Sequence, residues 1–353
     1  MFDLKKAFAP ALLAGILVAG SAAAAPASRI TSQLEMGQSW LTNQEDVNLR
    51  FTLVNESATA VSVLKWQTPF AGIDDDLFTV ARNGEPVAYL GRHIKRPAPT
   101  AADFLVLQPG QRISANVELT KYYDMSRSGE YTIVYNQSLQ SSANRLNDTT
   151  SNVVSFWIEG DDAAVEAPAA ADDNNTRALT PSYVSCSSTQ KSSIASALSS
   201  AETYAVNAYS YLSSRTTTAQ RDASTRYKTW FGTQTSSRWS TVQSHYLNIR
   251  NTIQTKTITF NCGCTDSYYA YVYPNSPYTI YLCNAFWTAP STGTDSKAGT
   301  IVHELSHFTV VAATDDWAYG QSACKSLAIS NPSRATDNAD SHEYFAENTP
   351  SLP

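Results

Sequence analysis

The chain has 353 residues, of which 42% are hydrophobic and 16% are charged, and this is the composition of a globular protein rather than of a disordered chain. Its length favours two domains over one. The net charge is -6, and the 25 Lys and Arg residues are spread along the chain without a basic run. Because nucleic-acid-binding proteins usually carry a basic patch, we expect no nucleic-acid partner.

Residues 1–25 have the order of a secretory signal peptide. Lys5 and Lys6 precede an apolar stretch from Ala7 to Val18, and the small-residue run from Ser21 to Ala25 follows it. This apolar stretch is shorter than the ~20 residues that a spanning helix needs, and no later segment reaches that length. We therefore predict a secreted, extracellular protein with no membrane anchor.

Residues 26–159 consist of short segments in which apolar and polar residues alternate, as in half-buried strands. The clearest segment is 47–53, and the others are 60–66, 77–82, 87–90, 104–107, 112–119, 131–135 and 153–158. Asn83-Gly84 and Pro109-Gly110 provide turns between them. This pattern predicts an all-β sandwich resembling an immunoglobulin-like module. The segment contains no cysteine and no cluster of catalytic residue types.

Residues 160–180 are rich in Ala, Asp, Pro and Asn and have no bulky apolar periodicity, which is typical of an exposed linker. Proteases reach such segments easily, so we predict that an activating cleavage falls here. No lysine lies between Lys121 and Lys191, so an enzyme that cuts only at lysine could not cut this linker. Release of the N-terminal half would then require that the enzyme also cuts at other residues, or that another protease cuts the linker, for example at Arg177.

Residues 181–353 have a helical pattern. Apolar residues recur at three- and four-residue steps from Thr189 to Ser213, and a second helix is predicted from Thr218 to Phe231. All five cysteines lie in this half, at positions 186, 262, 264, 283 and 324. Since disulfides form in oxidising compartments, this half is the one that must persist outside the cell. The N-terminal half is then a propeptide, or alternatively a permanent substrate-binding domain.

The sequence GTIVHELSHF, at residues 299–308, contains the motif H-E-x-x-H. On a helix, His303 and His307 lie one turn apart on the same face, so both imidazoles can bind one Zn²⁺. Glu304 between them can act as the base of a metallopeptidase. The alternative is a helix that carries two surface histidines by chance, but the apolar residues around the motif favour a buried helix.

A catalytic zinc needs a third protein ligand. A metzincin would have Gly at position 310 and His at position 313, whereas this chain has Val310 and Ala313, which excludes that class. A glutamate of the thermolysin type could come from Glu343 or Glu347.

A nearer carboxylate lies in the segment ATDDWAYG. Asp316 follows His307 by nine residues, which lets the helix end and the chain turn back under the metal. Asp315 competes with it for this role.

HELSH, followed by D-x-x-Y-G and then by N-A-D-x-x-E-Y-F-A-E-N, resembles the aspzincin zinc metalloendopeptidases, a family that includes deuterolysins and peptidyl-Lys metalloendopeptidases. The resemblance spans roughly residues 181–350. It implies a mainly α-helical, zincin-type catalytic domain with one Zn²⁺ per chain. By this resemblance His303, His307 and Asp316 are zinc ligands, Glu304 is the general base and Tyr319 donates a hydrogen bond in the transition state.

The same resemblance implies two disulfides, Cys186 with Cys262 and Cys264 with Cys283. Spacing alone leaves fifteen pairings open, because any of the five cysteines can be unpaired and four cysteines allow three connectivities. We expect Cys324 to be a buried small hydrophobe. A cysteine protease is the weaker alternative to zinc chemistry, because Cys324 lacks a recognised nucleophile context.

On a helix, Asp340 and Glu343 would lie on one stripe. A solvated acidic face is the ordinary interpretation of such a stripe. However, peptidyl-Lys enzymes have an Asp and a Glu at these positions to hold the lysine whose amino side is cleaved, and the resemblance therefore implies lysine at P1'.

The sequence thus predicts a secreted zinc endopeptidase that acts on proteins or peptides and is made as a zymogen, with its own propeptide as inhibitor. The alternative is a secreted binding or adhesion protein in which the β-sandwich binds the partner and the zinc is not catalytic. Glu304 argues against that alternative, because a structural zinc site needs no base between its histidines.

Overall fold

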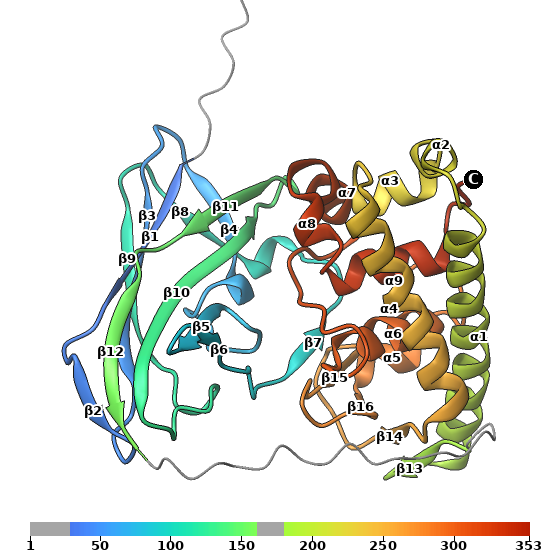
Figure 1. Ribbon diagram of the computed structural model, residues 1–353, viewed down its shortest axis with the longest axis horizontal. Helices are drawn as coiled ribbons and strands as arrows, with labels where there is room; N and C mark the ends of the chain where they lie inside the picture. The colour runs from blue at the N-terminus through green and yellow to red at the C-terminus, as the bar shows by residue number, and fades with distance from the viewer. Residues whose placement is uncertain (1–28, 161–179) are drawn as a thin grey trace, which may run out of the picture.

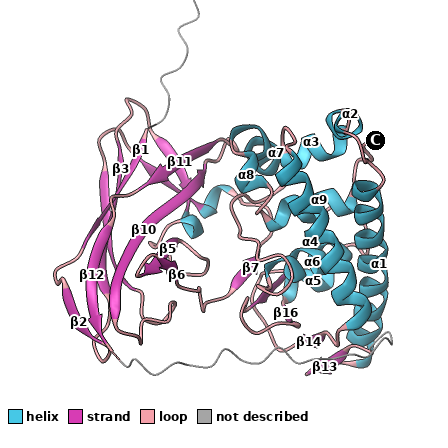
Figure 2. Ribbon diagram, viewed as in Figure 1, coloured by secondary structure: helices cyan, strands magenta, loops and turns pink. Residues whose placement is uncertain are grey.

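The computed structural model describes residues 29–160 and 180–353, so the predicted signal peptide and nearly all of the predicted linker lie outside the described residues. An N-terminal region made of strands lies beside a C-terminal region made mostly of helices (Figures 1 and 2). Within the described ranges, no helix is long and apolar enough to cross a membrane.

The N-terminal half contains two sheets and a separate strand pair. One sheet has the order β1-β3-β9, at Ile30–Glu35, Asn48–Asn55 and Arg112–Glu118. The second has the order β2-β12-β10-β5-β6, at Trp40–Thr42, Val154–Glu159, Gly129–Gln140, Phe78–Arg82 and Glu85–Pro86. Strand β11, Leu146–Thr150, pairs with β10, while β4, Val61–Leu64, pairs with β8, Phe104–Leu107. Two short 3-10 helices lie at Lys65–Gln67 and Ala101–Asp103.

Alternation in the sequence accounts for the core of this half. In β3 the side chains of Leu49, Phe51 and Leu53 are buried, as period-2 patterning requires. The ring of Phe51 packs on that of Tyr135 in β10, with centroids 4.6 Å apart, so the two sheets face each other across the core.

The prediction of a strand over 87–90 is wrong. The structure has the two-residue β6 just before it, and within 87–90 only an isolated bridge, from Tyr89 to Tyr123. Strands β1, β2 and β11 were not predicted, and neither was β7, at His93–Lys95. This strand has only 3 residues, His-Ile-Lys, which is too short for a period to be recognised, and all three are buried.

Nine helices and a sheet occupy residues 180–353. The helices are α1 (Ser188–Ser213), α2 (Thr218–Asp222), α3 (Thr225–Phe231), α4 (Ser236–Thr255), α5 (Asn284–Thr288), α6 (Lys297–His307), α7 (Gln321–Ser330), α8 (Pro332–Ala335) and α9 (Ala339–Glu347). The sheet has the order β13-β14-β16-β15-β7, with β13 at Ser182–Val184, β14 at Thr259–Asn261, β15 at Ala270–Val272 and β16 at Thr279–Leu282. Strand β7 of the N-terminal half is therefore the edge strand of the C-terminal sheet.

The single helix predicted from Thr218 to Phe231 is two helices. Ser224 begins the second one, because its hydroxyl accepts a hydrogen bond from the backbone N–H of Tyr227 at 3.1 Å. Serine in this role is a strong helix start signal that the apolar period does not reveal.

Two disulfides stabilise the C-terminal half, Cys186–Cys262 and Cys264–Cys283, which are the pairs that the resemblance implied. Cys324 is unpaired and fully buried. Its thiol contacts the side-chain amide of Asn338 at 3.4 Å, and burial raises its pKa well above the usual value, so it has no thiolate character.

Candidate active site

Helix α6 carries the H-E-x-x-H motif in the interior of the C-terminal half. Ser296 caps its N-terminus, and Gly299 lets helix α9 approach, because a Cβ at this position would collide with the carboxylates of Glu343 and Glu347. His303 and His307 lie one turn apart, and their Nε2 atoms are 3.1 Å from each other. The helical spacing thus brings two imidazole nitrogens to one point.

Asp316 brings a carboxylate to the same point from the loop after α6. Its Oδ1 lies 3.5 Å from Nε2 of His303, and its Oδ2 lies 3.5 Å from Nε2 of His307. Both oxygens are buried and accept no hydrogen bond from any residue in the described ranges. Ligands ~2.0 to 2.1 Å from a tetrahedral zinc are about 3.3 Å apart. The three groups therefore fit a zinc ion, and such an ion would satisfy the buried carboxylate.

The other ring nitrogens of the two histidines are positioned by partners. Nδ1 of His303 lies 2.9 Å from Oδ1 of Asp340, and Nδ1 of His307 donates to the backbone carbonyl of Thr314 at 2.6 Å. These contacts leave Nε2 free for a metal on each ring. Burial lowers the pKa of His307 well below its usual value, so the ring is a neutral ligand.

Glu304 is fully buried, and neither of its carboxylate oxygens has a hydrogen-bond partner in the described part of the chain. Burial raises its pKa to about 7, against the lowering effect of His303 and Lys95. A carboxylate with this pKa can take a proton from water and give it back near neutral pH.

The competing ligands lie elsewhere. The Asp315 side chain is 32% exposed, and its Oδ1 is 3.8 Å from Nε2 of His93 rather than beside the Nε2 pair. Glu347 accepts hydrogen bonds from the backbone N–H and the hydroxyl of Ser296, and thereby holds the start of α6. Glu343 contacts Lys95. Among the four carboxylates weighed as ligands, Asp316 is the one that meets both histidines.

Asp340 and Glu343 form a pocket that contains the ammonium of Lys95, a residue of β7. The Lys95 Nζ is 3.2 Å from Oδ1 of Asp340, 4.0 Å from Oδ1 of Asp295 and in contact with Oε2 of Glu343. It also lies 5.4 Å from the ring centre of Tyr269. The lysine is 1% exposed, so this is a desolvated ion pair.

The charges in this pocket support each other. Burial would lower the pKa of Lys95, but Asp340 and Glu343 outweigh burial and hold this pKa well above its usual value. Burial would also raise the pKa of Asp340, but Lys95 and His303 hold it well below its usual value. Burial raises the pKa of Glu343. The pocket is therefore built for a cation.

Strand β7 is held by backbone pairing as well. It runs antiparallel to β15, with His93 opposite Val272, Ile94 opposite Tyr271 and Lys95 opposite Ala270. The backbone N–H of Tyr269 donates to the carbonyl of Lys95 at 3.0 Å. An extended segment thus lies along the sheet edge beside the metal-ligand cluster.

Tyr319 is 1% exposed and is held mainly by the N-terminal half. Its hydroxyl donates to Oδ2 of Asp75 at 2.7 Å. Its backbone N–H donates to Oε1 of Gln140 at 3.0 Å, and its carbonyl accepts from Nε2 of Gln140 at 3.1 Å. Burial and then Asp75 raise the pKa of Tyr319 well above its usual value, so the hydroxyl keeps its proton and is a donor.

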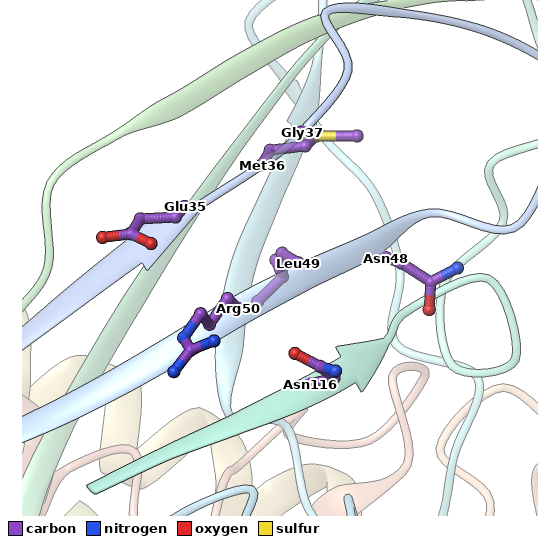
Figure 3. A pocket seen from close by; sticks show the side chains of 7 residues that line it. All are labelled: Glu35, Met36, Gly37, Asn48, Leu49, Arg50 and Asn116. Atoms are coloured by element: carbon purple, nitrogen blue, oxygen red, sulfur yellow. The ribbon is translucent and has the colours of Figure 1, made fainter.

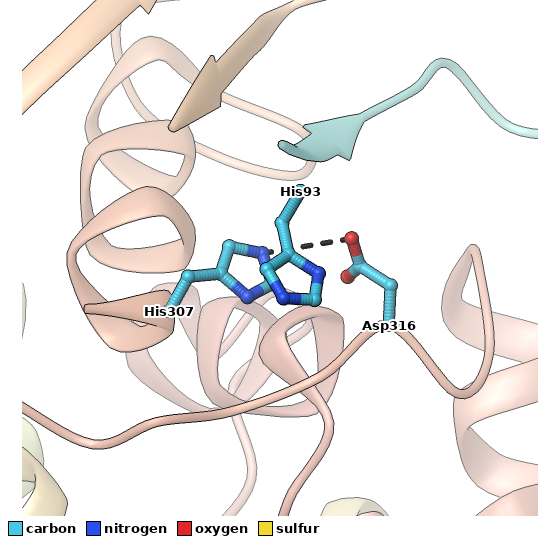
Figure 4. Close-up of side chains that lie close together, drawn as sticks. All are labelled: His93, His307 and Asp316. Carbon is cyan, nitrogen blue, oxygen red and sulfur yellow. Dashed lines mark ion pairs between the residues drawn. The ribbon is translucent and has the colours of Figure 1, made fainter. Parts of the chain in front are cut away.

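His93 covers the metal-ligand cluster. Figure 4 shows its ring in front of that of His307, near Asp316, and the two rings are stacked with centroids 4.5 Å apart and planes 7° apart. Nδ1 of His93 lies 2.7 Å from Oδ1 of Asp75. His93, His307 and Asp316 also form a group whose ligand atoms lie within 4.8 Å of one another and could hold a metal ion. Because the His93 ring stacks face to face on that of His307, we take His303 as the second zinc ligand and His93 as the residue that covers the cluster.

Asp75, His93 and Lys95 were missed in the sequence because no motif marks them. One signal was available: residues 29–160 contain three lysines, at positions 65, 95 and 121, and a buried pair of carboxylates needs a cation. Of these, Lys95 alone is buried.

Of two further hollows in the described part of the chain, one lacks this chemistry and the other adjoins it. Figure 3 shows one on the β1-β3-β9 sheet, lined by Glu35, Asn48, Arg50, Asn116 and neighbours, with one carboxylate and no histidine or cysteine. A pocket of about 240 Å³ lies between the halves and is lined by residues that include His93, His307 and Asp315. This second pocket leads to the metal-ligand cluster.

Comparison with known proteins identifies the same chemistry. The lysine-specific metallo-endopeptidase (aspzincin) family matches residues 216–347. An extracellular protease of Aeromonas hydrophila is 43% identical over 348 residues, which cover 96% of this chain and 97% of that protein. A peptidyl-Lys metalloendopeptidase of Grifola frondosa is 41% identical over 288 residues, which cover 78% of this chain and 80% of that protein. A solved zinc peptidase from Grifola frondosa is 50% identical, with 48% of this chain and 100% of that chain covered and a TM-score of 0.45.

Proposed function

The chain belongs to the aspzincin family and is a zinc metalloendopeptidase, and from that premise we propose that it is a secreted enzyme that cleaves on the amino side of lysine and is made as an inactive precursor. The similarity to the Aeromonas extracellular protease and to the Grifola peptidyl-Lys metalloendopeptidase supports secretion and lysine specificity.

We assign one zinc per chain to His303, His307 and Asp316, because their ligand atoms converge at the spacing of a tetrahedral site. A zinc ion held by these residues would polarise the scissile carbonyl and lower the pKa of a bound water. Asp340 and the Thr314 carbonyl orient the two imidazoles through their Nδ1 atoms.

Two further side chains, Glu304 and Tyr319, transfer a proton and stabilise developing negative charge. Glu304 takes a proton from the attacking water and delivers it to the leaving amine, for which a pKa of about 7 is well suited. The hydroxyl of Tyr319, once free of Asp75, donates to the carbonyl oxygen as that oxygen gains negative charge.

The observation that carries the lysine specificity is the ammonium of Lys95 between Asp340 and Glu343. An ammonium loses its hydration in a buried pocket, so it binds there only if carboxylates compensate. Lys95 reaches this pocket from an extended strand beside the metal ligands, as a P1' lysine of a substrate would.

The same contacts support the proposal that residues 26–159 are an immunoglobulin-like propeptide that covers the active site. His93 stacks on a metal ligand, Lys95 fills the cation pocket and Asp75 holds the hydroxyl of Tyr319. Export through the signal peptide at residues 1–25 and a cut within the linker at residues 160–180 complete the proposal. N-terminal sequencing of the active secreted form tests it: a start near residue 180 is expected, and an active form with the N-terminal half intact contradicts it.

A binding or adhesion protein with a non-catalytic zinc is not favoured. Such a protein would gain nothing from burying Glu304 without a hydrogen-bond partner beside the metal ligands, because that arrangement costs free energy.

The cleavage-site profile of a denatured protein mixture, read by mass spectrometry, tests the specificity. We expect lysine at P1', and random or hydrophobic residues there would contradict it. Replacing both carboxylates of the pocket, Asp340→Asn with Glu343→Gln, should remove the lysine preference at a cost of about 2 to 5 kcal/mol in transition-state binding. Zinc content is measured in parallel, because Asp340 also contacts His303.

A further inference from the structure

The strand that blocks the site has its lysine where the P1' lysine of a substrate would lie, so a precursor that stays latent needs a feature that prevents hydrolysis. For an enzyme that cuts before lysine, the bond between Ile94 and Lys95 has its lysine in the P1' pocket and its backbone paired along β15. The carbonyl of Ile94 accepts a hydrogen bond from Nη1 of Arg96 at 3.5 Å, which leaves the lysine and the strand in a substrate-like position. The precursor should therefore cut itself at this bond.

We propose that Asp75 prevents this cut by taking the hydroxyl of Tyr319, so that the N-terminal half is an occupant of the active site that is bound but not hydrolysed. The inference rests on the proposed function. It adds the residue that keeps the N-terminal half from being hydrolysed as a substrate would be.

The argument begins with the single proton of the tyrosine hydroxyl. Tyr319 donates it to Oδ2 of Asp75 at 2.7 Å, and the side chains of Tyr319 and Asp75 are 1% and 4% exposed. A hydroxyl has one hydrogen to donate, so while this bond exists it cannot stabilise the charge on the carbonyl oxygen of Ile94. The carboxylate of Asp75 also opposes a second negative charge nearby.

Asp75 also contacts β7, the strand that contains the Ile94–Lys95 bond. Its other oxygen, Oδ1, lies 2.7 Å from Nδ1 of His93, and His93 stacks on His307. Gln140 holds both backbone groups of Tyr319 from the N-terminal half. Tyr319, Asp75 and the strand are thus held together, and the hydroxyl stays with Asp75 for as long as the N-terminal half is in place.

The suppressed reaction is an ordinary hydrolysis. The water oxygen forms a bond to the carbonyl carbon of Ile94, and the bond from that carbon to the nitrogen of Lys95 breaks. The proton that water loses passes through Glu304 to the amine of Lys95. No oxidant or reductant takes part.

The first experiment uses the zinc-loaded, full-length precursor. Asp75→Ala should produce a new N-terminus at Lys95 at least tenfold faster than the wild-type precursor does, as measured by intact mass and N-terminal sequencing. Asp75→Asn should stay uncut, because its amide oxygen still accepts from Tyr319. Addition of Glu304→Gln to Asp75→Ala should abolish the cut.

Asp76→Ala is the matched control. Asp76 lies in the same loop and accepts from the hydroxyl of Tyr123 at 2.6 Å, so its loss loosens the loop without freeing Tyr319. If Asp76→Ala is cut at Ile94–Lys95 as fast as Asp75→Ala, or if folded Asp75→Ala is not cut, the proposal is overturned.

A second measurement needs no variant. A synthetic peptide with the sequence of residues 89–100, YLGRHIKRPAPT, contains the same bond without Asp75. The active enzyme should cut it between Ile94 and Lys95, while the folded precursor leaves this bond intact. If the enzyme cuts other lysyl peptides but not this one, the inference about Asp75 is overturned and the proposed function stands. If the enzyme shows no preference for lysine, the proposed function is overturned.

Discussion

The two halves of the molecule bury opposite charges, and each supplies what the other lacks. The C-terminal half buries the carboxylates of Asp316, Asp340 and Glu343 around the site, whereas the N-terminal half brings His93 and Lys95. The acids within 4.0 Å of the Lys95 ammonium all come from the C-terminal half. Lys95 therefore finds its acidic partners only in the other half, whereas His93 also has Asp75 of its own half 2.7 Å away.

This difference explains how one pocket can serve both inhibition and catalysis. An unpaired buried charge costs several kcal/mol, so the carboxylates of α9 favour any lysine that reaches them. Lys95 meets that requirement in this structure, and under the proposed function a substrate lysine would meet it once the N-terminal half is removed. The halves also differ in covalent support, since both disulfides lie in the C-terminal half, which is the half proposed to act alone.

The largest expected effect is on turnover, and it comes from a substitution that leaves the ion pairs between the halves intact. Glu304→Gln should reduce turnover of a lysyl peptide by roughly 10² to 10⁴-fold, because an amide cannot accept the proton of water. The ion pairs between the halves and the zinc content should be unchanged. Near wild-type turnover in the pure variant would contradict the mechanism. Glu202→Gln, at a partly exposed glutamate of α1, is the control.

The next change removes the positive charge that the N-terminal half contributes to the carboxylate pocket. Lys95→Met keeps the length of the side chain but leaves Asp340 and Glu343 without their cation, which should cost about 3 to 5 kcal/mol of association between the halves. The precursor should then hydrolyse short lysyl peptides that the wild-type precursor does not. Lys121→Met, at an exposed lysine of the same half, should leave the precursor inactive. Full latency of Lys95→Met would show that the ion pairs are dispensable.

A third change acts on the C-terminal half alone and separates two adjacent acids. Asp316→Ala removes a charged ligand and should weaken zinc binding by roughly 100-fold or more, beyond what loss of a supporting contact does. Asp315→Ala should leave the zinc in place, as metal analysis after dialysis would show. The reverse pattern would make Asp315 the ligand.

The smallest expected effect concerns the loop that positions Asp316. Ala313 has a φ of 51°, in the left-handed region, where a Cβ is unfavourable. Ala313→Gly should therefore stabilise the C-terminal half by about 1 kcal/mol in denaturant unfolding. Ala312→Gly, at a position without positive φ, should not stabilise it. Equal effects of the two variants would exclude backbone strain as the cause.

Local patterns allowed much of the C-terminal half to be predicted. The apolar period predicted α1 to within one residue at its start, and the H-E-x-x-H spacing brought His303 and His307 together because side chains four residues apart share a helix face. The few residues after α6 left Asp315 and Asp316 as candidates, and the D-x-x-Y-G resemblance selected Asp316. In the N-terminal half, alternation predicted β3, β5, β8 and β9 but not β7, because a strand of 3 residues is too short to show a period.

The sequence by itself thus predicted the H-E-x-x-H metal motif, because that motif depends on residue types at short spacing, whereas the expectation of lysine at P1' came from the resemblance to peptidyl-Lys enzymes. Only the tertiary structure decided that Lys95 fills the pocket, that Asp75 holds Tyr319 and that Asp340 also contacts His303. The first two contacts join residues 245 and 244 positions apart, and the third joins helices α6 and α9. No local propensity encodes such pairs, since they form only when the two halves, or the two helices, bury complementary charges against each other.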